Sequence, residues 1–241
     1  MKNLLTLLFL AAFSVNAQTV LLMHDVENDK ASEEGPGKLR YTGQYYGGGL
    51  MIGAPENDSS AINYGKSLYF FTGSKLKIET NPLLAFGLET MFQYRHYSIA
   101  QTNEKLFQAP IQHKKENFHV LDYQADAYMR INFTKKGNHF GKYLDFGVYG
   151  AYNFYTRLVT VDKVNSAESK QNRIVYSRLR YINRIEYGGM IRLGTSILSA
   201  HLKYRASDLF KSFTNDLGTT TNFPELPRFQ LGIGFDIPGG N

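Results

Sequence analysis

Between residues 118 and 133 the chain alternates between apolar and polar side chains. The first set is Leu121, Tyr123, Ala125, Ala127, Met129, Ile131 and Phe133, and the interleaved set is Asp122, Gln124, Asp126, Tyr128, Arg130 and Asn132. Successive side chains of a β-strand point to opposite faces, so this period of two predicts an amphipathic strand. A long strand with acids and bases on one face suits a wall between hydrocarbon and a polar interior.

Similar alternation recurs along the chain and predicts about eight strands in all. The other runs are 39–53, 67–78, 83–99, 143–159, 180–193, 196–209 and 228–237. The first run contains Gly47, Gly48 and Gly49, which predict either a β-bulge or unusually close packing at that point.

The connections between these runs alternate between long and short. The long ones, 54–66, 100–117, 160–179 and 210–227, are polar, whereas the short ones carry turn residues such as Asn81-Pro82 and Gly137-Asn138. Bacterial outer-membrane barrels have short periplasmic turns and long extracellular loops. A soluble barrel does not require this asymmetry.

Alternation alone leaves open which face is inside, because a lipocalin-like soluble barrel would place its apolar face inward. Three features favour the membrane alternative. The charged face carries both signs, aromatic side chains recur on the apolar face near strand ends, and the final strand ends in alternating Phe235 and Ile237. We therefore predict an all-β fold, a transmembrane up-and-down antiparallel β-barrel of about eight strands with a polar, plugged lumen.

The N-terminus has the features of an export signal. Lys2 precedes an apolar stretch over residues 4–13, and Val15-Asn16-Ala17 fits the small-residue cleavage rule. A retained N-terminal anchor is the alternative. We predict a signal peptide over 1–17, a periplasmic extension over 18–38 and the barrel over 39–241, located in the cell outer membrane.

Composition narrows the possible chemistry. The sequence has no cysteine, which excludes disulfides, thiol nucleophiles and cysteine-ligated metals. Its formal net charge of +6 is spread along the chain without a compact basic tract, so we predict no nucleic-acid partner. Solvated charge gathers in an acidic stretch of the extension and in a basic loop around Lys163, Lys170, Arg173 and Arg178.

The charged face predicts a network of ion pairs inside the barrel, because unpaired charges in so narrow a space would be costly. Bulky Tyr128, Tyr149 and Tyr155 would share that space, and Arg157 would face it. The predicted lumen charge network consists of Glu89, Arg95, Asp122, Asp126, Arg130, Asp145, Arg184, Glu186, Arg192, Lys203 and Arg205.

Two segments near the C-terminus resemble the PorT-like outer-membrane β-barrel family. They read YRASDLFK over 204–211 and ELPRFQLGIGFDI over 225–237. The resemblance implies a structural or partner-binding component of the cell envelope, with secretion or surface-protein assembly as its setting. The chain departs from a standard barrel ending in that Pro238-Gly239-Gly240-Asn241 follows the last aromatic residue.

One short motif raises the possibility of catalysis. His96-Tyr97-Ser98 resembles the His-x-Ser element of outer-membrane lipid A deacylases, but Ile99 replaces the usual Asn and no acid at a suitable spacing orients His96. We predict no enzyme activity, no cofactor and no metal site, and keep a deacylase-like enzyme and a small-solute porin as alternatives. The expected partners are outer-membrane lipid and lipopolysaccharide, with other envelope proteins as further candidates.

Overall fold

The structure is a computed structural model. It describes residues 37, 39–53, 60–103, 105, 112–134, 141–164, 170–195, 197–214, 220–221 and 223–238. The chain divides into two units, Met1–Ser32 and Glu33–Asn241, and all described residues belong to the second. The predicted signal peptide and all but residue 37 of the predicted extension therefore lie outside the described residues. In the described ranges, no helix has the length and hydrophobicity needed to span a membrane.

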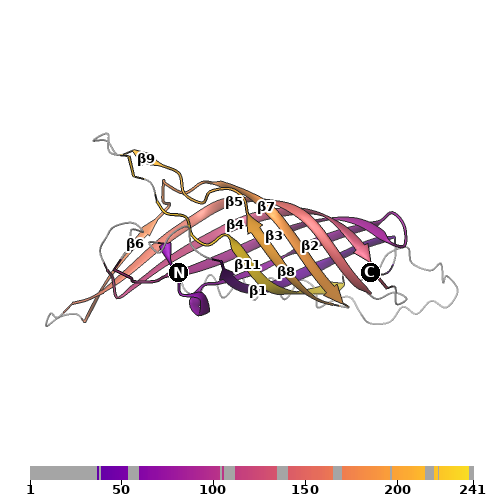
Figure 1. Ribbon diagram of the computed structural model, residues 1–241, viewed down its shortest axis with the longest axis horizontal. Helices are drawn as coiled ribbons and strands as arrows, with labels where there is room; N and C mark the ends of the chain where they lie inside the picture. The colour runs from indigo at the N-terminus through magenta and orange to yellow at the C-terminus, as the bar shows by residue number, and fades with distance from the viewer. Residues whose placement is uncertain are drawn as a thin grey trace, which may run out of the picture. The chain divides into compact units, whose positions relative to one another are not determined.

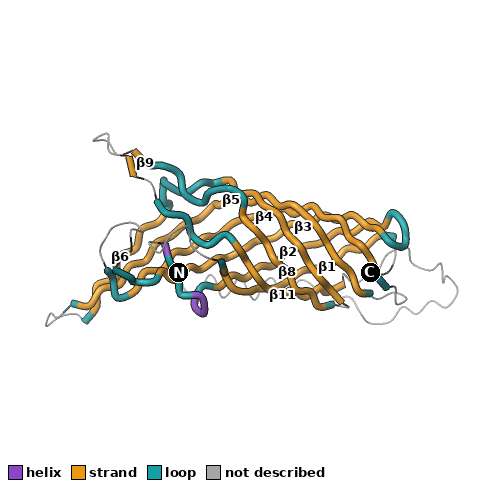
Figure 2. Tube along the Cα trace, viewed as in Figure 1, coloured by secondary structure: helices purple, strands orange, loops and turns teal. Residues whose placement is uncertain are grey.

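Eight antiparallel strands form a closed ring (Figures 1 and 2). The sheet order is β4-β3-β2-β1-β11-β8-β7-β5, and β5 pairs back with β4 to complete the circuit. The ring strands are β1 (Arg40–Ile52), β2 (Leu68–Glu79), β3 (Leu84–Ile99), β4 (Lys115–Asn132), β5 (Lys142–Lys163), β7 (Ile185–Thr195), β8 (Leu198–Arg205) and β11 (Phe229–Pro238). The prediction of an all-β fold with about eight strands is confirmed.

The two ends of the ring differ in their connections. At the turn end, β2 is joined to β3 over residues 80–83 and β7 to β8 over residues 196–197. At the loop end lie the longer connections, which include the 3₁₀ turn η2 (Tyr64–Lys66) and the two-stranded β9 (Phe213–Thr214) and β10 (Thr220–Thr221).

A further strand, β6 (Gln171–Ser177), pairs with β5 beyond the ring at the loop end. The sequence analysis placed these residues in a loop over 160–179 and began the next strand at 180, whereas β7 begins at Ile185. Every residue of β6 is exposed, so the strand has no buried face and carries no alternating signal.

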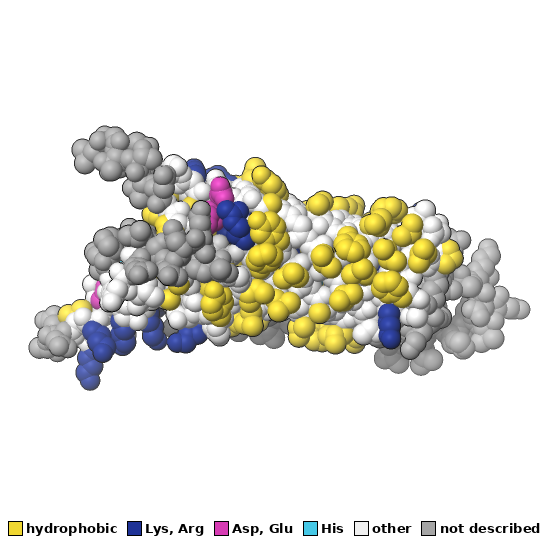
Figure 3. Space-filling model, in the orientation of Figure 1, with side chains coloured by type: hydrophobic (Ala, Val, Ile, Leu, Met, Phe, Trp, Pro, Cys, Tyr) yellow, Lys and Arg dark blue, Asp and Glu magenta, His cyan; other side chains and the backbone are white. Residues whose placement is uncertain are grey.

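Alternation along the ring strands separates apolar from charged side chains. On β3, Phe86, Leu88 and Phe92 are exposed, whereas Glu89 and Arg95 are buried inside the ring. Figure 3 shows hydrophobic side chains spread over the outer face of the strands in view, with Lys and Arg mainly toward the loop end. The ring thus presents its apolar face outward.

A β-bulge in β5 reverses this alternation near the loop end. Leu121 of β4 lies opposite Tyr155, but its neighbour Asp122 lies opposite Asn153, so Phe154 is the extra residue. On the loop-end side of the bulge, Thr156 and Leu158 are buried whereas Tyr155 and Arg157 are not. The prediction that Tyr155 and Arg157 face the interior was therefore wrong, because the alternation was extended through the bulge without a shift.

The interior contains an apolar cluster as well as charges. This cap cluster combines ring residues such as Tyr69, Phe71 and Met91 with residues of the loop-end connections. The connecting segments contribute Ile62, Ile182, Leu209, Phe210 and Leu226. The sequence analysis expected a polar interior. The interior is instead apolar in part, because these connections turn apolar side chains inward.

Two glycines show how bulky rings fit inside. A Cβ at Gly47 would lie 2.4 Å from Cζ of Phe71, and one at Gly87 would lie 2.3 Å from Oη of Tyr128. Of the two alternatives for Gly47–Gly49, the structure shows close packing, because β1 keeps a continuous register with both β2 and β11.

Candidate functional site

Near the turn end, six strands each contribute one charged side chain to a single network. This turn-end network consists of Lys75, Glu89, Arg130, Asp145, Arg192 and Asp236, which makes three cations and three carboxylates. Lys75 Nζ lies 2.7 Å from Asp236 Oδ1 and 3.2 Å from Glu89 Oε1. Arg192 Nη2 donates to Glu89 Oε2 across the ring at 2.7 Å.

The same network is closed on its other side by a bidentate pair. Arg130 donates from Nε and Nη2 to the two oxygens of Asp145 at 2.7 and 2.9 Å. The Arg130 guanidinium also lies 3.5 Å from the centre of the Tyr143 ring, a cation–π contact. Planar pairing and stacking suit arginine better than lysine at this position.

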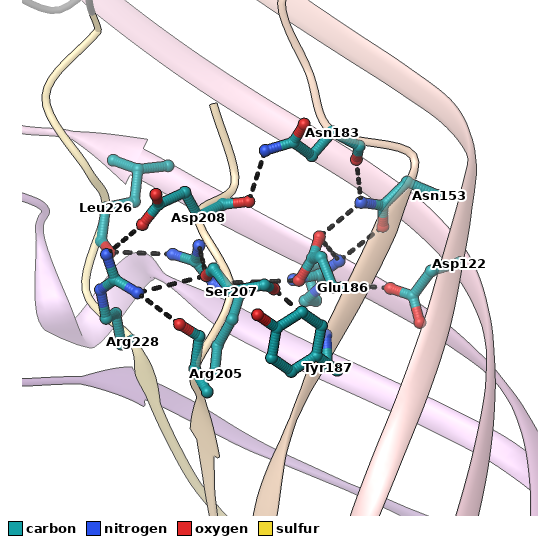
Figure 4. Close-up of polar contacts among 12 residues, drawn as sticks. Asp122, Asn153, Asn183, Glu186, Tyr187, Arg205, Ser207, Asp208, Leu226 and Arg228 are labelled. Carbon is teal, nitrogen blue, oxygen red and sulfur yellow. Dashed lines mark hydrogen bonds and ion pairs between the residues drawn. The ribbon is translucent and has the colours of Figure 1, made fainter. Parts of the chain in front are cut away.

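Toward the loop end lies a second group of side chains, the loop-end network of Arg95, Asp122, Asn153, Glu186, Arg205 and Glu225. Figure 4 labels Asp122, Asn153, Glu186 and Arg205 of this group. Arg95 donates to both oxygens of Glu186 at 2.8 Å and from Nε to Asp122 at 3.0 Å. Arg205 donates to Glu225 Oε2 at 2.8 Å and to the carbonyl oxygen of Leu226.

Between the two networks, Lys203 Nζ on β8 reaches Asp126 Oδ2 on β4 at 3.0 Å. Lys203 and Asp126 are both buried, as are the members of the two networks. Removing charges from water is offset only when each finds partners of good geometry. Here some partners come from the neighbouring strand, as for Arg130 and Asp145, and others from across the ring, as for Arg192 and Glu89. The interior is thereby filled with side chains.

Most of the predicted lumen residues come together in this way. Those buried inside the ring with a charged partner are Glu89, Arg95, Asp122, Asp126, Arg130, Asp145, Glu186, Arg192, Lys203 and Arg205. For Arg184 the prediction was wrong: its side chain is exposed, because it precedes the first residue of β7 and the alternation does not extend to it.

Sequence reasoning missed several buried carboxylates, namely Glu79, Glu116 and Glu225. Glu225 lies in the connection between β8 and β11, where no strand periodicity marks it as facing inward. It nevertheless accepts hydrogen bonds from Arg205 and from the backbone N–H of Phe210. Only the folded path of this connection brings Glu225 to the mouth of the ring.

A basic pocket of about 540 Å³ lies at the loop end where β5 meets the segment 178–184. Arg178, Arg180, Arg184 and Lys211 contribute its four cations. The other lining residues are Tyr152, Asn153, Phe154, Thr156, Leu179 and Ile182, so no carboxylate lines the pocket.

The candidate catalytic pair has separate contacts. Nδ1 of His96 lies 3.2 Å from Nδ1 of His119, whereas Oγ of Ser98 accepts a hydrogen bond from Asn63 at 3.2 Å. Within the described residues, no hydrogen bond joins His96 to Ser98 and no carboxylate forms an ion pair with His96. Nor does the described part of the chain contain a cluster of three or more side chains suited to hold a metal ion.

Two groups outside the ring strands have shifted pKa values. Burial raises the pKa of the Tyr181 phenol well above its ordinary value, and the nearby Glu116 carboxylate adds to this effect, so Tyr181 stays neutral. Partial burial opposes the charged form of Arg228, but its hydrogen bond to Asp208 outweighs that effect and raises the pKa of Arg228. Both groups hold fixed protonation states in the loop-end connections.

The chain matches no protein-family model, and no curated protein is significantly similar to it.

Proposed function

We propose that this protein is an outer-membrane β-barrel that serves as a structural or partner-binding component of the cell envelope. The observation that carries the proposal is the reversed polarity of the ring. Ile185, Val148 and Phe70 have 70%, 63% and 58% of their surface exposed, while the charged side chains of the networks are buried. A protein in water would bury such apolar side chains and expose the charged ones.

The dimensions of the ring suit a bilayer. Membrane-spanning β-strands need about 9–11 residues when tilted, and β1 has 13 residues and β3 has 16. Tyr94, Tyr152 and Tyr204 are exposed toward the loop end of their strands, where interfacial aromatic residues would lie. In this orientation the loop end faces the cell exterior and the turn end faces the periplasm.

A binding or structural role fits the filled interior better than transport does. The two charge networks and the cap cluster occupy the space through which a solute would pass. By contrast, β6 extends beyond the ring, where it pairs with β5 and exposes all of its residues. Exposed strands at the margin of a sheet are a common site of partner recognition. A role in secretion or surface-protein assembly, as the PorT-like resemblance implies, belongs to the same proposal.

Cell fractionation combined with gel mobility tests the location. We expect the protein in the outer-membrane fraction, extractable only with detergent, and migrating faster without heating than after boiling, because closed barrels resist dodecyl sulfate until heated. A matched periplasmic protein and a known outer-membrane barrel from the same cells provide the two reference positions. Recovery of the protein in the soluble periplasm, or a mobility that heating leaves unchanged, would contradict the proposed location.

A further inference from the structure

The basic pocket borders the loop-end network, with which it shares Asn153, but its four cations belong to neither interior charge network. It is bordered by residues 152–156 of β5 and by the segment 178–184, which leads from β6 to β7. Tyr181 and Ile182 of this segment pack with the cap cluster, whereas Arg178, Arg180 and Arg184 are exposed. The segment thus separates apolar from cationic side chains, and the latter meet at the pocket.

Within the described ranges, the cations of this pocket are not paired with carboxylates as the interior cations are. Arg95, Arg192 and Lys203 each pair with a buried carboxylate. Among the described residues, none of Arg178, Arg180, Arg184 and Lys211 forms an ion pair with a carboxylate. Four converging positive charges without an acid repel one another, and an anion would relieve that repulsion.

The backbone that carries these cations is held in place. The N–H of Arg178, whose φ is 57°, donates to the carbonyl oxygen of Thr156 at 2.9 Å. The carbonyl oxygen of Arg184 accepts from the N–H of Asn153 at 2.7 Å, and the N–H of Lys211 donates to Tyr181 O at 2.9 Å. The backbone of Arg178 therefore lies in the left-handed region, a conformation that the surrounding structure imposes on it. A prearranged site loses less entropy on binding.

The wall of the pocket is aromatic and faces outward. Tyr152 and Phe154 line it and are 46% and 45% exposed, so the pocket opens beside the apolar outer surface of the ring. A ligand held there would place an anionic group among the cations and apolar parts along that surface. We propose that the pocket binds the phosphate group of an outer-leaflet lipid headgroup, an inference that rests on the proposed membrane location.

The chemistry of the lining residues fits phosphate. A guanidinium group offers parallel N–H donors that match two phosphate oxygens, and lysine adds a point charge. The volume of about 540 Å³ exceeds what a bare phosphate ion needs and leaves room for a phosphorylated sugar. This combination favours a glycolipid phosphate over free phosphate.

Native mass spectrometry of the detergent-solubilised protein tests the inference. The probes are diphosphoryl lipid A, the same lipid with its phosphates removed, and inorganic phosphate. We expect diphosphoryl lipid A to bind and the dephosphorylated lipid to bind about tenfold more weakly, because hydrogen bonds between charged groups are lost. Inorganic phosphate at the same concentration should not displace the lipid.

Two variants with equal loss of charge separate the pocket from general electrostatic attraction. The pocket variant carries R178Q, R180Q and R184Q, and the control variant carries K163Q, K170Q and R173Q in the exposed β5–β6 hairpin. We expect about a tenfold loss of affinity for the first and less than about twofold for the second. K211Q alone, expected to weaken binding several-fold, provides a reading if the triple variant folds poorly.

Three results would overturn the inference: equal loss in both triple variants, equal binding of the dephosphorylated lipid, or displacement by inorganic phosphate, which would assign the pocket to the free ion. Heat-modifiable mobility of each purified variant is measured alongside. If the wild-type protein fails that measurement or fractionates as a soluble protein, the proposed location fails. If the wild-type protein shows heat-modifiable mobility and the pocket variant binds the lipid as well as the wild type does, only the proposed lipid site is rejected.

Discussion

At the scale of single residues, the buried charges of the ring act in pairs. Lys203 and Asp126 form the simplest case, since Lys203 has no other carboxylate within ion-pair distance among the described residues. Asp126 also accepts a hydrogen bond from Gln124. A buried charge that loses its partner has neither water nor a counter-charge, so the pair matters chiefly through what happens when one member is removed.

We predict that Asp126→Asn lowers the free energy of unfolding by about 3 kcal/mol, because it leaves the Lys203 ammonium buried without a counter-charge. The substitution keeps the size of the side chain and so creates no cavity. Unfolding by urea in detergent micelles, followed by circular dichroism because the chain has no tryptophan, measures the change.

The double variant Asp126→Asn with Lys203→Met is the matched control. It removes both charges, so we expect it to lose roughly half as much stability as the single variant or less. A double variant that loses as much as both single variants together would mean that the two charges do not compensate each other.

At the scale of elements, β5 shows what sequence periodicity can and cannot predict. The part of β5 near the turn end follows the alternation, with Asp145 and Tyr149 buried as expected. On the loop-end side of Phe154 the bulge exchanges the side chains that face inward with those that face outward. No residue type at that point predicts the exchange. The whole of β6 was missed because residues that are exposed on both faces carry no period. The start of β7 was placed too early, because Tyr181 was included in its alternating run although it packs with the cap cluster before the strand begins.

The exposure of β6 leads to a prediction about partners. Ile174 and Tyr176 lie on one face of the strand and are 39% and 50% exposed, and we expect them to anchor a partner at that strand. The double variant Ile174→Lys with Tyr176→Lys should lose a specific subset of co-purifying envelope proteins in mild detergent, because lysines on an edge strand oppose pairing.

The control variant for β6 carries Asn172→Lys and Ser177→Lys, which add the same charge to the same strand but keep its apolar residues. It should retain the partners. Identical sets of co-purifying proteins from the wild type and the apolar-to-lysine variant would show that β6 is not a docking element.

At the scale of the whole molecule, the ring is closed to passage by two different barriers. Charged side chains from neighbouring and opposing strands meet from the turn end up to the loop-end network, and the cap cluster adds apolar side chains at the loop end. The sequence predicted the first barrier, because alternation places acids and bases on one face. It did not predict the second, because Ile182, Leu209 and Leu226 lie in connections without a periodic pattern. Which acid meets which base depends on register, which periodicity does not determine.

We predict that the purified protein in a planar bilayer gives no steady, large single-channel conductance, because the paired charges and the cap cluster occupy the interior of the ring. A general porin recorded in the same bilayer provides the positive control for insertion and detection. Stable openings comparable to those of the porin would contradict the plugged interior.

The pairing of β1 with β11, which places Gly43 opposite Pro238, has a consequence for biogenesis. Since the two strands stand at the beginning and the end of the ring sequence, no ribosome or export channel can release a closed circuit before the last strand has emerged. Until then the chain carries two unpaired hydrogen-bonding edges, each a template for aggregation. A premature stop codon anywhere upstream of β11 would therefore leave an open sheet with two unpaired edges, which we expect to aggregate or to be degraded.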